Sequence, residues 1–375
     1  MIYLDHNATT EPAPDVVEAM LHTLRHHWAN ASSPHDPGQQ SKRALGAART
    51  RVAQALGCKP TEVVFTSGAT EANHLALNGL LQAARVGRRR VVLSAVEHSG
   101  LLRLGATLAH QGVTVDLVPA TPEGLPDMAA AAEMLGPDVA VVSLMAANNE
   151  TGVLMPVAAM AELAHRAGAV LHVDATQWVG KLPLHFGEWG VDALSLSAHK
   201  FHGPKGVGAL LLRQGVPFQP PWPGSQERGR RAGTENLPAI VGMATALELC
   251  SNDLPAEVRR VGALRDALEQ GLAGALAQGV HVWGQGVPRL PGTSLWRTGE
   301  VHADVVLQRL SRLGVAAASG AACASGGSQP SHVLRAMGVP DAQALAAVRF
   351  SLGRATTAAD VAAVVSGLPP LLPLA

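Results

Sequence analysis

Seven short and almost continuously apolar segments constrain the fold of this chain more than any other feature of its sequence. They alternate with segments of helical apolar spacing, such as 71–86, 99–111 and 156–167, and two further helices are predicted at 14–28 and 38–57. Strands that are apolar on both faces need helices on both faces, which is typical of a mainly parallel sheet. We therefore predict an α/β domain with strands at 62–66, 90–95, 114–119, 138–145, 169–175, 192–198 and 206–213.

The pattern changes after the turn-rich segment 251–257. The sequence there predicts a long helix to about residue 278, then strands near 280–283, 293–297 and 348–352 and helices near 302–313, 331–338 and 357–367. This mixture indicates a smaller α+β domain. We expect residues 14–250 to form the large domain, and residues 1–13 and 251–375 to form the small one.

Composition limits the possible classes of function. The 375 residues carry acidic and basic side chains in equal number, and no apolar run is long enough for a membrane span. The basic clusters at 85–90 and 227–231 are short, so we expect a cytoplasmic protein that binds neither membranes nor nucleic acid directly. The three cysteines, Cys58, Cys250 and Cys323, lack CxxC spacing and are predicted to be reduced thiols rather than disulfides or zinc ligands.

Lys200 is the most distinctive of only five lysines, the others being Lys42, Lys59, Lys181 and Lys205. It directly follows a predicted strand and precedes the glycine-containing stretch GPKGVG, where backbone can approach a ligand. Ligands of open α/β sheets bind beyond the carboxyl ends of the strands, which is where Lys200 is expected to lie. The nearby His199 and His202 have no third partner that would complete a metal site, so no resident metal is predicted.

Other strand ends carry complementary groups. Asp174 ends an apolar strand, where a carboxylate is costly without a cation or several donors. Residues 67–70 pass from a strand into a helix whose N-terminus attracts phosphate, His98 offers a flat ring, and Asn149 offers an amide. An amine, an acid, an anion cradle and a ring are the set that pyridoxal 5′-phosphate (PLP) uses.

Ten segments in order resemble the cysteine desulfurases of the NifS and IscS type, a branch of the class V aminotransferase-fold PLP enzymes. The resemblance spans nearly the whole chain and implies the PLP-dependent transferase fold of type I, with a mainly parallel central sheet and a smaller α+β domain. The segments are YLDHNATT, NASSPHDPG, FTSGATEANHLA, VEHS, NNETG, HVDATQWVGK, SLSAHKFHGPKGVGALLLR, QERGRRAGTEN, SGAACASGGSQPSHVLRAMG and RFSLGRATT.

The resemblance also implies a role for each matching residue. Lys200 would form the Schiff base with PLP, Asp174 would hold the pyridine nitrogen protonated, Gln177 would bond the ring hydroxyl and His98 would stack on the ring. Ala69, Thr70, Ser197 and His199 would hold the phosphate, and Thr234 would reach it from the second subunit of a homodimer. Asn149, also a cofactor contact, and Arg354 would bind the substrate carboxylate, and Cys323 would accept the sulfur.

The implied reaction converts L-cysteine to L-alanine and leaves a persulfide on Cys323. Its sulfur would pass to an acceptor such as an iron-sulfur scaffold protein, or to tRNA thiolation, and the persulfide could ligate a transferred iron-sulfur cluster. Alternatives within the fold are a selenocysteine or cysteine-sulfinate lyase and a class V transaminase. An alternative of another class is a non-catalytic scaffold or sulfur-carrier protein, against which the presence of Lys200, Asp174 and Arg354 argues.

Cys323 lies in a run of Ala, Ser and Gly that has few side chains able to anchor it. A thiol that collects sulfur in a closed pocket and delivers it to a partner has to move between two positions. We therefore predict that residues 321–330 are weakly ordered, or placed differently, when no partner is bound.

Overall fold

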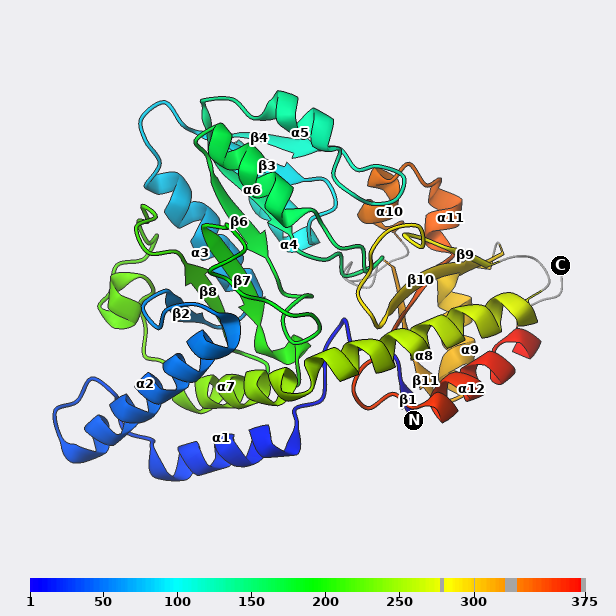
Figure 1. The fold of residues 1–375 in the computed structure, drawn as a ribbon, viewed down its shortest axis with the longest axis horizontal. Coiled ribbons are helices and arrows are strands. Elements are labelled where there is room, and N and C mark those ends of the chain that lie inside the picture. The colour runs from blue at the N-terminus through cyan, green and yellow to red at the C-terminus, as the bar shows by residue number, and fades with distance from the viewer. Residues whose placement is uncertain (277–279, 300, 321–328, 372–375) are drawn as a thin grey trace.

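A seven-stranded sheet forms the centre of the larger part of the molecule, with strand order β2-β8-β7-β6-β5-β3-β4 (Figure 1). The computed structural model describes residues 1–276, 280–299, 301–320 and 329–371. The strands are β2 (Val63–Thr66), β3 (Arg90–Ser94), β4 (Thr114–Val118), β5 (Val139–Met145), β6 (Val170–Asp174), β7 (Ala193–Ser197) and β8 (Gly208–Leu212). The mainly parallel sheet predicted from the sequence is confirmed.

Strand β8 is the exception, because it runs antiparallel to both of its neighbours, β2 and β7. Gly208, its first residue, passes beneath the backbone of Gly68, and a side chain at this position would collide with Gly68 and with the carbonyl oxygen of Leu196. A glycine is therefore needed where β8 supports the turn that leads from β2 into the next helix.

Helices cover both faces of this sheet, as the apolar strands require. Alternate strand residues divide between two cores: Val63 and Phe65 join one, and Val64 joins the other. The second core is completed by α3 (Ala69–Gln82) and α4 (Ser99–His110). The first receives α2 (Asp36–Leu56), α5 (Met128–Met134), α6 (Val157–Arg166) and α7 (Leu237–Asn252), and α1 (Pro14–His26) packs on α7.

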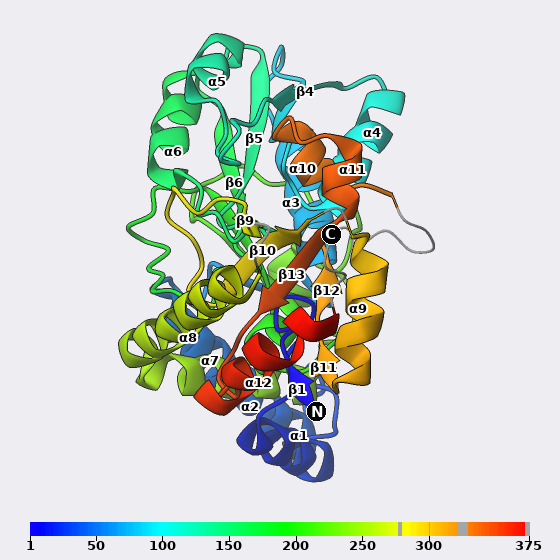
Figure 2. The same cartoon turned by 90° about the vertical axis from the view of Figure 1, so that its right-hand side faces the viewer.

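A smaller sheet of order β12-β13-β10-β9 lies at the other end of the molecule (Figures 1 and 2). Its strands are β9 (Val280–Val282), β10 (Thr293–Thr298), β12 (Ala318–Ser319) and β13 (Ala347–Ser351). A separate apolar core joins it to α8 (Leu254–Ala275), α9 (Ala303–Arg312) and α12 (Ala358–Gly367), while α10 (His332–Ala336) and α11 (Asp341–Leu345) lie toward the large sheet.

The N-terminal arm belongs with this smaller part. Strand β1 (Ile2–Tyr3) pairs in parallel with β11 (Val315–Ala316), and Leu4 lies in the smaller core. These contacts place the first residues of the chain with the smaller part, and the division at residues 13 and 250 remains a proposal.

The segment 251–257 is not the turn that its composition suggested. Helix α7 continues to Asn252 and α8 begins at Leu254, so that Asp253 alone separates them. Pro255 lies in the first turn of α8, where its missing N–H costs no hydrogen bond. Proline and polar residues here mark a break between two helices rather than a loop.

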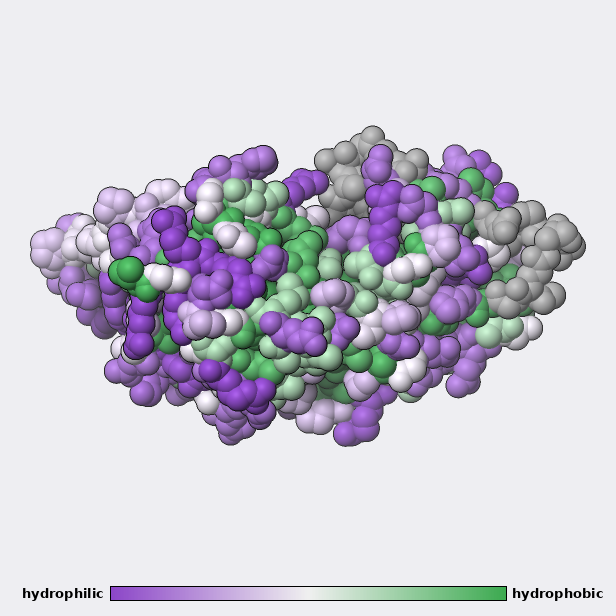
Figure 3. Space-filling model, turned by 90° about the horizontal axis from the view of Figure 1, so that it is seen from above, coloured by the Kyte–Doolittle hydropathy of each residue, from purple (hydrophilic) through white to green (hydrophobic). Residues whose placement is uncertain are grey.

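The surface is mixed in character. The face seen from above carries hydrophilic residues along its margins and smaller hydrophobic patches toward its middle (Figure 3). Within the described ranges, no helix combines the length and the apolar character that a bilayer crossing requires.

A buried ion pair ties the segment 226–229 to the large sheet. Arg49 donates to both carboxylate oxygens of Glu227 at 2.7 Å, and Glu227 also accepts from the backbone N–H of Phe65 at 2.9 Å. Glu227 and Arg228 both have positive φ, at 47° and 58°, which costs energy for residues other than glycine. The bidentate pair offsets this cost and fixes the start of the segment that leads to Thr234.

We predict that Glu227→Gln lowers the free energy of unfolding by about 3 kcal/mol, because it leaves the buried Arg49 guanidinium without its charged partner. Chemical denaturation of the purified variant measures this loss. Glu188→Gln, at a carboxylate whose side chain is 78% exposed, serves as the control and should change stability by less than about 0.5 kcal/mol. Equal effects of the two substitutions would contradict the structural role of Glu227.

Candidate active site

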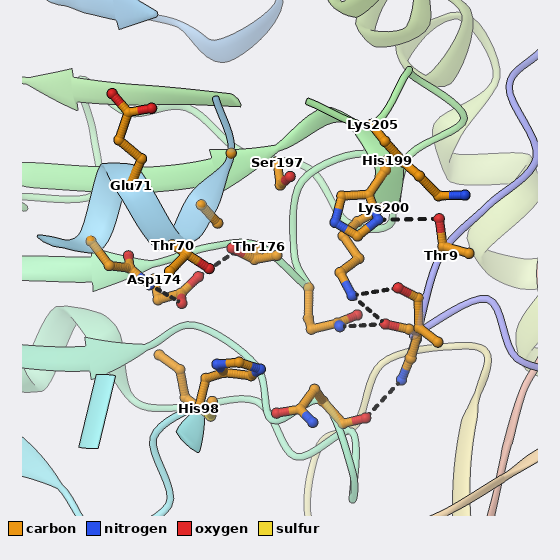
Figure 4. Close-up of a pocket in the computed structure, with 18 of the residues that line it drawn as sticks. Thr9, Thr70, Glu71, His98, Asp174, Thr176, Ser197, His199, Lys200 and Lys205 are labelled. Carbon is orange, nitrogen blue, oxygen red and sulfur yellow. Dashed lines mark hydrogen bonds between the residues drawn. The ribbon is translucent and has the colours of Figure 1, made fainter. Parts of the chain in front are cut away.

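A cavity of about 560 Å³ opens at the carboxyl ends of the parallel strands of the large sheet. Lys200, Asp174 and His98 come from three different strand ends and surround the same space (Figure 4). Most of the residues predicted from the sequence to form a site therefore line one cavity: Ala69, Thr70, His98, Asn149, Asp174, Gln177, Ser197, His199 and Lys200. Its position agrees with the rule that ligands of such sheets bind beyond the carboxyl edge.

Lys200 lies in a short 3₁₀ turn, Ala198–Lys200, that directly continues β7. Its Nζ donates to the backbone oxygens of Asn7 at 2.7 Å and of Ala8 at 2.8 Å. The amine is thus held against the N-terminal arm, at the wall of the cavity, by neutral acceptors.

Asp174 is the last residue of β6 and is 6% exposed. One carboxylate oxygen accepts from Asn73 Nδ2 at 2.7 Å and the other from the backbone N–H of Thr176 at 3.0 Å. Within the described residues no cationic side chain forms an ion pair with it. A nearly buried carboxylate at a cavity wall, held by neutral donors, is suited to a positively charged group of a ligand.

The N-terminus of α3 faces the same cavity at Ala69 and Thr70. In the described structure no side chain caps this helix, so its first backbone N–H groups are available to an anion. The acidic Glu71 beside them is paired with Arg231 Nε at 2.7 Å and accepts from the backbone N–H of Ser67. Burial opposes ionisation of Glu71, but these hydrogen bonds outweigh it and lower its pKa.

The histidines of the cavity are held neutral. Burial lowers the pKa of His98 and, with the charge of Lys200, lowers the pKa of His199 to about 4. His98 Nδ1 accepts from the backbone N–H of Gly100 at 3.1 Å, so the neutral ring carries its proton on Nε2. A neutral imidazole of fixed tautomer suits a ring that stacks on a ligand.

Two arginines lie near the site. Arg354, predicted to bind the substrate carboxylate, lines a neighbouring, smaller cavity that also contains Lys200 and Asn7, and it donates to the backbone oxygen of Cys250. Arg349 lines the main cavity and is 2% exposed. Its guanidinium donates to Asp5 at 2.7 Å and to the backbone oxygen of Asn149 at 2.9 Å.

Two further predicted residues lie elsewhere. Thr234 is exposed and lines a separate pocket near Ser67, not the main cavity of its own chain. Cys323 lies outside the described residues, as do residues 321–328 of the segment predicted to be weakly ordered. No three His, Cys, Asp or Glu side chains in the described parts of the chain are arranged to hold a metal ion.

Sequence reasoning missed two residues of the cavity region. Asn7 is 3% exposed and accepts from both Lys200 and Gln177 through its backbone oxygen. Lys181 donates to the side-chain oxygens of Asn7 and Gln177. Both residues lie within segments quoted above, but nothing in the local pattern distinguishes them from ordinary polar residues.

Glu150 joins the cavity region to the two ends of the cysteine segment. Its Oε2 accepts from Ser331 Oγ, and a Cβ placed on Gly320 would lie 3.2 Å from the same oxygen. Burial raises the pKa of Glu150 to about 7, against the opposing effects of Ser331 and Arg349. Gly320 precedes Cys323 and Ser331 follows it, so one carboxyl group bonds one flank and lies close to the other.

The family model for "Aminotransferase class-V" matches residues 2–364, almost the whole chain. The chain belongs to this family. A curated cysteine desulfurase of Cereibacter sphaeroides is 49% identical over 374 residues, which cover 99% of this chain and 95% of that protein. The fold of a solved "NifS-like protein" matches with a TM-score of 0.92, at 33% identity, over 99% of this chain and 98% of the other. A second structure, "SspA in complex with cysteine", has a TM-score of 0.83 at 29% identity and covers 94% and 99% of the two chains.

These similarities confirm the resemblance, the fold class and the enzyme class inferred from the sequence. The protein is a cysteine desulfurase of the class V aminotransferase family. The carboxyl-edge cavity is therefore the candidate active site of a desulfurase.

We predict that Glu150 makes the stability of this desulfurase depend on pH between about 4.5 and 7. In the unfolded chain Glu150 ionises near pH 4.5, whereas in the folded protein it keeps its proton until about pH 7. Raising the pH through this window therefore favours the unfolded state, by about 3 kcal/mol in total. The stability that Glu150 contributes is complete below pH 4.5 and is lost as the pH approaches 7.

Glu150→Gln removes this dependence, so the stability of the variant relative to wild type should rise by about 3 kcal/mol from pH 4.5 to pH 7. Chemical denaturation at the two pH values measures the difference, and the exposed Glu188→Gln variant should follow wild type at both. A constant difference between Glu150→Gln and wild type would show that Glu150 ionises normally in the folded protein.

Proposed function

We propose that this desulfurase uses PLP to convert L-cysteine to L-alanine and that Cys323 accepts the sulfur. The observation that carries the proposal is the convergence of Lys200, Asp174 and the uncapped N-terminus of α3 on one cavity. These groups offer an amine, a carboxylate that lacks an ion pair in the described structure, and anion-binding N–H groups.

The residues present fit PLP. Ala69 and Thr70 at the N-terminus of α3, with Ser197 and His199, would hold the phosphate. Asp174 would face the protonated pyridine nitrogen, Gln177 the ring hydroxyl and His98 the ring face, and Lys200 Nζ would bind the aldehyde carbon. Asn149 lines the same wall.

PLP, when bound, withdraws electrons from the substrate Cα, which makes the Cα proton and the Cβ–S bond labile. Lys200 Nζ takes the Cα proton and later returns one to the product. The Cys323 thiolate attacks the substrate sulfur, and the electron pair of the Cβ–S bond stays with the carbon fragment. The balance is L-cysteine plus the Cys323 thiol giving L-alanine plus the Cys323 persulfide.

The substrate carboxylate is proposed to bind Asn149 and Arg354. Arg354 lines the smaller cavity, whose wall also contains Lys200 and Asn7, so this space adjoins the reactive amine. Arg349 is less suited, because both terminal nitrogens of its guanidinium already donate, one to the Asn149 backbone oxygen and the other to Asp5. A guanidinium offers a planar pair of donors that matches a carboxylate.

A second copy of the chain is proposed to complete the site. Thr234 is exposed and does not line its own main cavity, which supports the proposal that it reaches a partner's phosphate site. A groove beside α1 is lined by apolar residues that are partly exposed, among them Val17, Leu21 and Leu24, and offers a surface for such a partner.

The acceptor of the persulfide sulfur is proposed to be an iron-sulfur scaffold protein or the tRNA thiolation machinery. The described cysteines, Cys58 and Cys250, are free thiols, which suits a reducing compartment such as the cytoplasm.

We predict that the purified protein, reconstituted with PLP, shows the visible absorbance of a lysine-bound cofactor, and that Lys200→Ala abolishes it. Cys323→Ala should keep this absorbance but lose at least about 100-fold in the rate of alanine formation, because the sulfur acceptor is missing. Cys58→Ala is the matched control and should retain wild-type turnover. Full turnover by Cys323→Ala would exclude the proposed acceptor, and a wild-type protein that binds no PLP would exclude the cofactor.

We predict that Arg354→Lys raises KM for L-cysteine about 10- to 100-fold, since a lysine cannot reproduce the planar donor pair. Arg335→Lys, at an exposed ion pair with Asp341, is the comparison and should change KM less than about threefold. Steady-state alanine formation measures both values, and thermal unfolding checks that each variant keeps its fold. Equal KM values for Arg354→Lys and wild type would exclude Arg354 as the carboxylate ligand.

A further inference from the structure

Lys181 places a second lysine amine behind the wall of the active-site cavity. Its Nζ lies 2.6 Å from Gln177 Oε1 and 2.8 Å from Asn7 Oδ1. The residue keeps some exposed surface, but its ammonium group is buried, and this burial, followed by the charges of Lys200 and Arg349, lowers its pKa well below the usual range. A buried amine is costly, so its two short contacts are a specific feature of the site.

The contacts of Lys181 fix the orientation of the Gln177 side-chain amide. The backbone oxygen of Asn7 can only accept, and it accepts from Gln177 Nε2 at 2.9 Å, so the amide oxygen faces Lys181, whose amine donates to it in either protonation state. A half-turn of the amide would place its NH₂ group against the lysine N–H groups and its oxygen against a carbonyl oxygen. Both ends of the amide thus favour the same orientation.

Asn7 is fixed in the same way. Its Oδ1 accepts from Lys181, and its Nδ2 donates to Thr293 Oγ1 at 2.9 Å and to the backbone oxygen of Asn149 at 3.2 Å. The backbone carbonyl that contacts both Gln177 and Lys200 is therefore held in place by the same lysine.

We propose that Lys181 is a positioning residue that holds the Gln177 amide with its NH₂ group toward the cavity, where it donates to the ring hydroxyl of PLP. The inference rests on the proposed function, because it concerns the contact of Gln177 with that cofactor. The NH₂ group has two hydrogens, and one of them bonds the Asn7 carbonyl, so the second can serve the cofactor. Without Lys181, Gln177 Oε1 loses its donor and the amide can reorient.

The test is a double-mutant cycle on PLP release, followed by absorbance during dialysis of the reconstituted protein. We expect Lys181→Met to raise the dissociation constant of PLP about 10- to 30-fold in the wild-type background, but no more than about threefold in the Gln177→Ala background. We also expect Lys181→Met and Gln177→Ala to give the same absorbance maximum, displaced from that of wild type. A merely structural role would produce neither the coupling nor the shared spectrum.

Lys59→Met is the matched control, because Lys59 also donates to a glutamine oxygen, that of Gln214 at 3.0 Å, but on the surface. It should leave PLP affinity and absorbance unchanged. Thermal unfolding of the apoproteins detects loss of the fold. Lys181→Gln keeps an N–H donor and should retain more PLP affinity than Lys181→Met, so it provides a second test if Lys181→Met is unstable.

The inference is overturned if Lys181→Met binds PLP within twofold of wild type, or if its effect is equally large with and without Gln177. Failure of the proposed function looks different, since wild type itself would then bind no PLP. Equal loss of affinity in Lys181→Gln and Lys181→Met would also overturn the inference, because a retained donor would then make no difference.

Discussion

The backbone carbonyl of Asn7 is the contact on which the arrangement of this active site depends. It accepts from Lys200 and from Gln177, two residues that come from different strand ends of the large sheet. The Asn7 side chain donates a hydrogen bond to Thr293 in the smaller sheet. A segment of the N-terminal arm thus joins the reactive amine, the wall of the cavity and the second sheet, which explains why the arm is buried although it carries several polar residues.

Burial decides which groups around the cavity carry charge. The pKa values of His98, His199 and His172 are lowered mainly by burial, so these rings are neutral near pH 7. Burial also raises the pKa of Glu97, with a further contribution from Asp174. Neutral histidines and a glutamate that resists ionisation contribute little charge, so the arginine side chains are the main positive partners for a ligand that carries phosphate and carboxylate groups.

The ends of the cysteine segment are tied to the same site. Glu150 follows Asn149, a residue of the cavity wall, accepts a hydrogen bond from Ser331 and lies close to Gly320. Adjacent residues of one loop, Asn149 and Glu150, therefore lie at the cavity wall and at the base of the cysteine segment.

The elements of the large sheet could be predicted from the sequence because continuously apolar strands with helices between them allow few arrangements. The antiparallel direction of β8 and the helical character of residues 251–257 could not. The direction of β8 depends on which strands it pairs with, and local sequence does not show this pairing. Proline occurs both in the first turn of a helix and in loops, so Pro255 did not distinguish the two.

The sequence alone determined the fold class, the enzyme family and the residues at the ends of individual strands, because each of these is written in local patterns and in motifs read in order. Only the tertiary structure decided which of two neighbouring cavities each arginine lines, since Arg349 and Arg354 are five residues apart and equally polar in sequence. It also revealed Lys181 behind Gln177 and Asn7 beneath Lys200. Their importance comes from contacts between distant segments, and such contacts form only when strand ends and the N-terminal arm are brought together by folding.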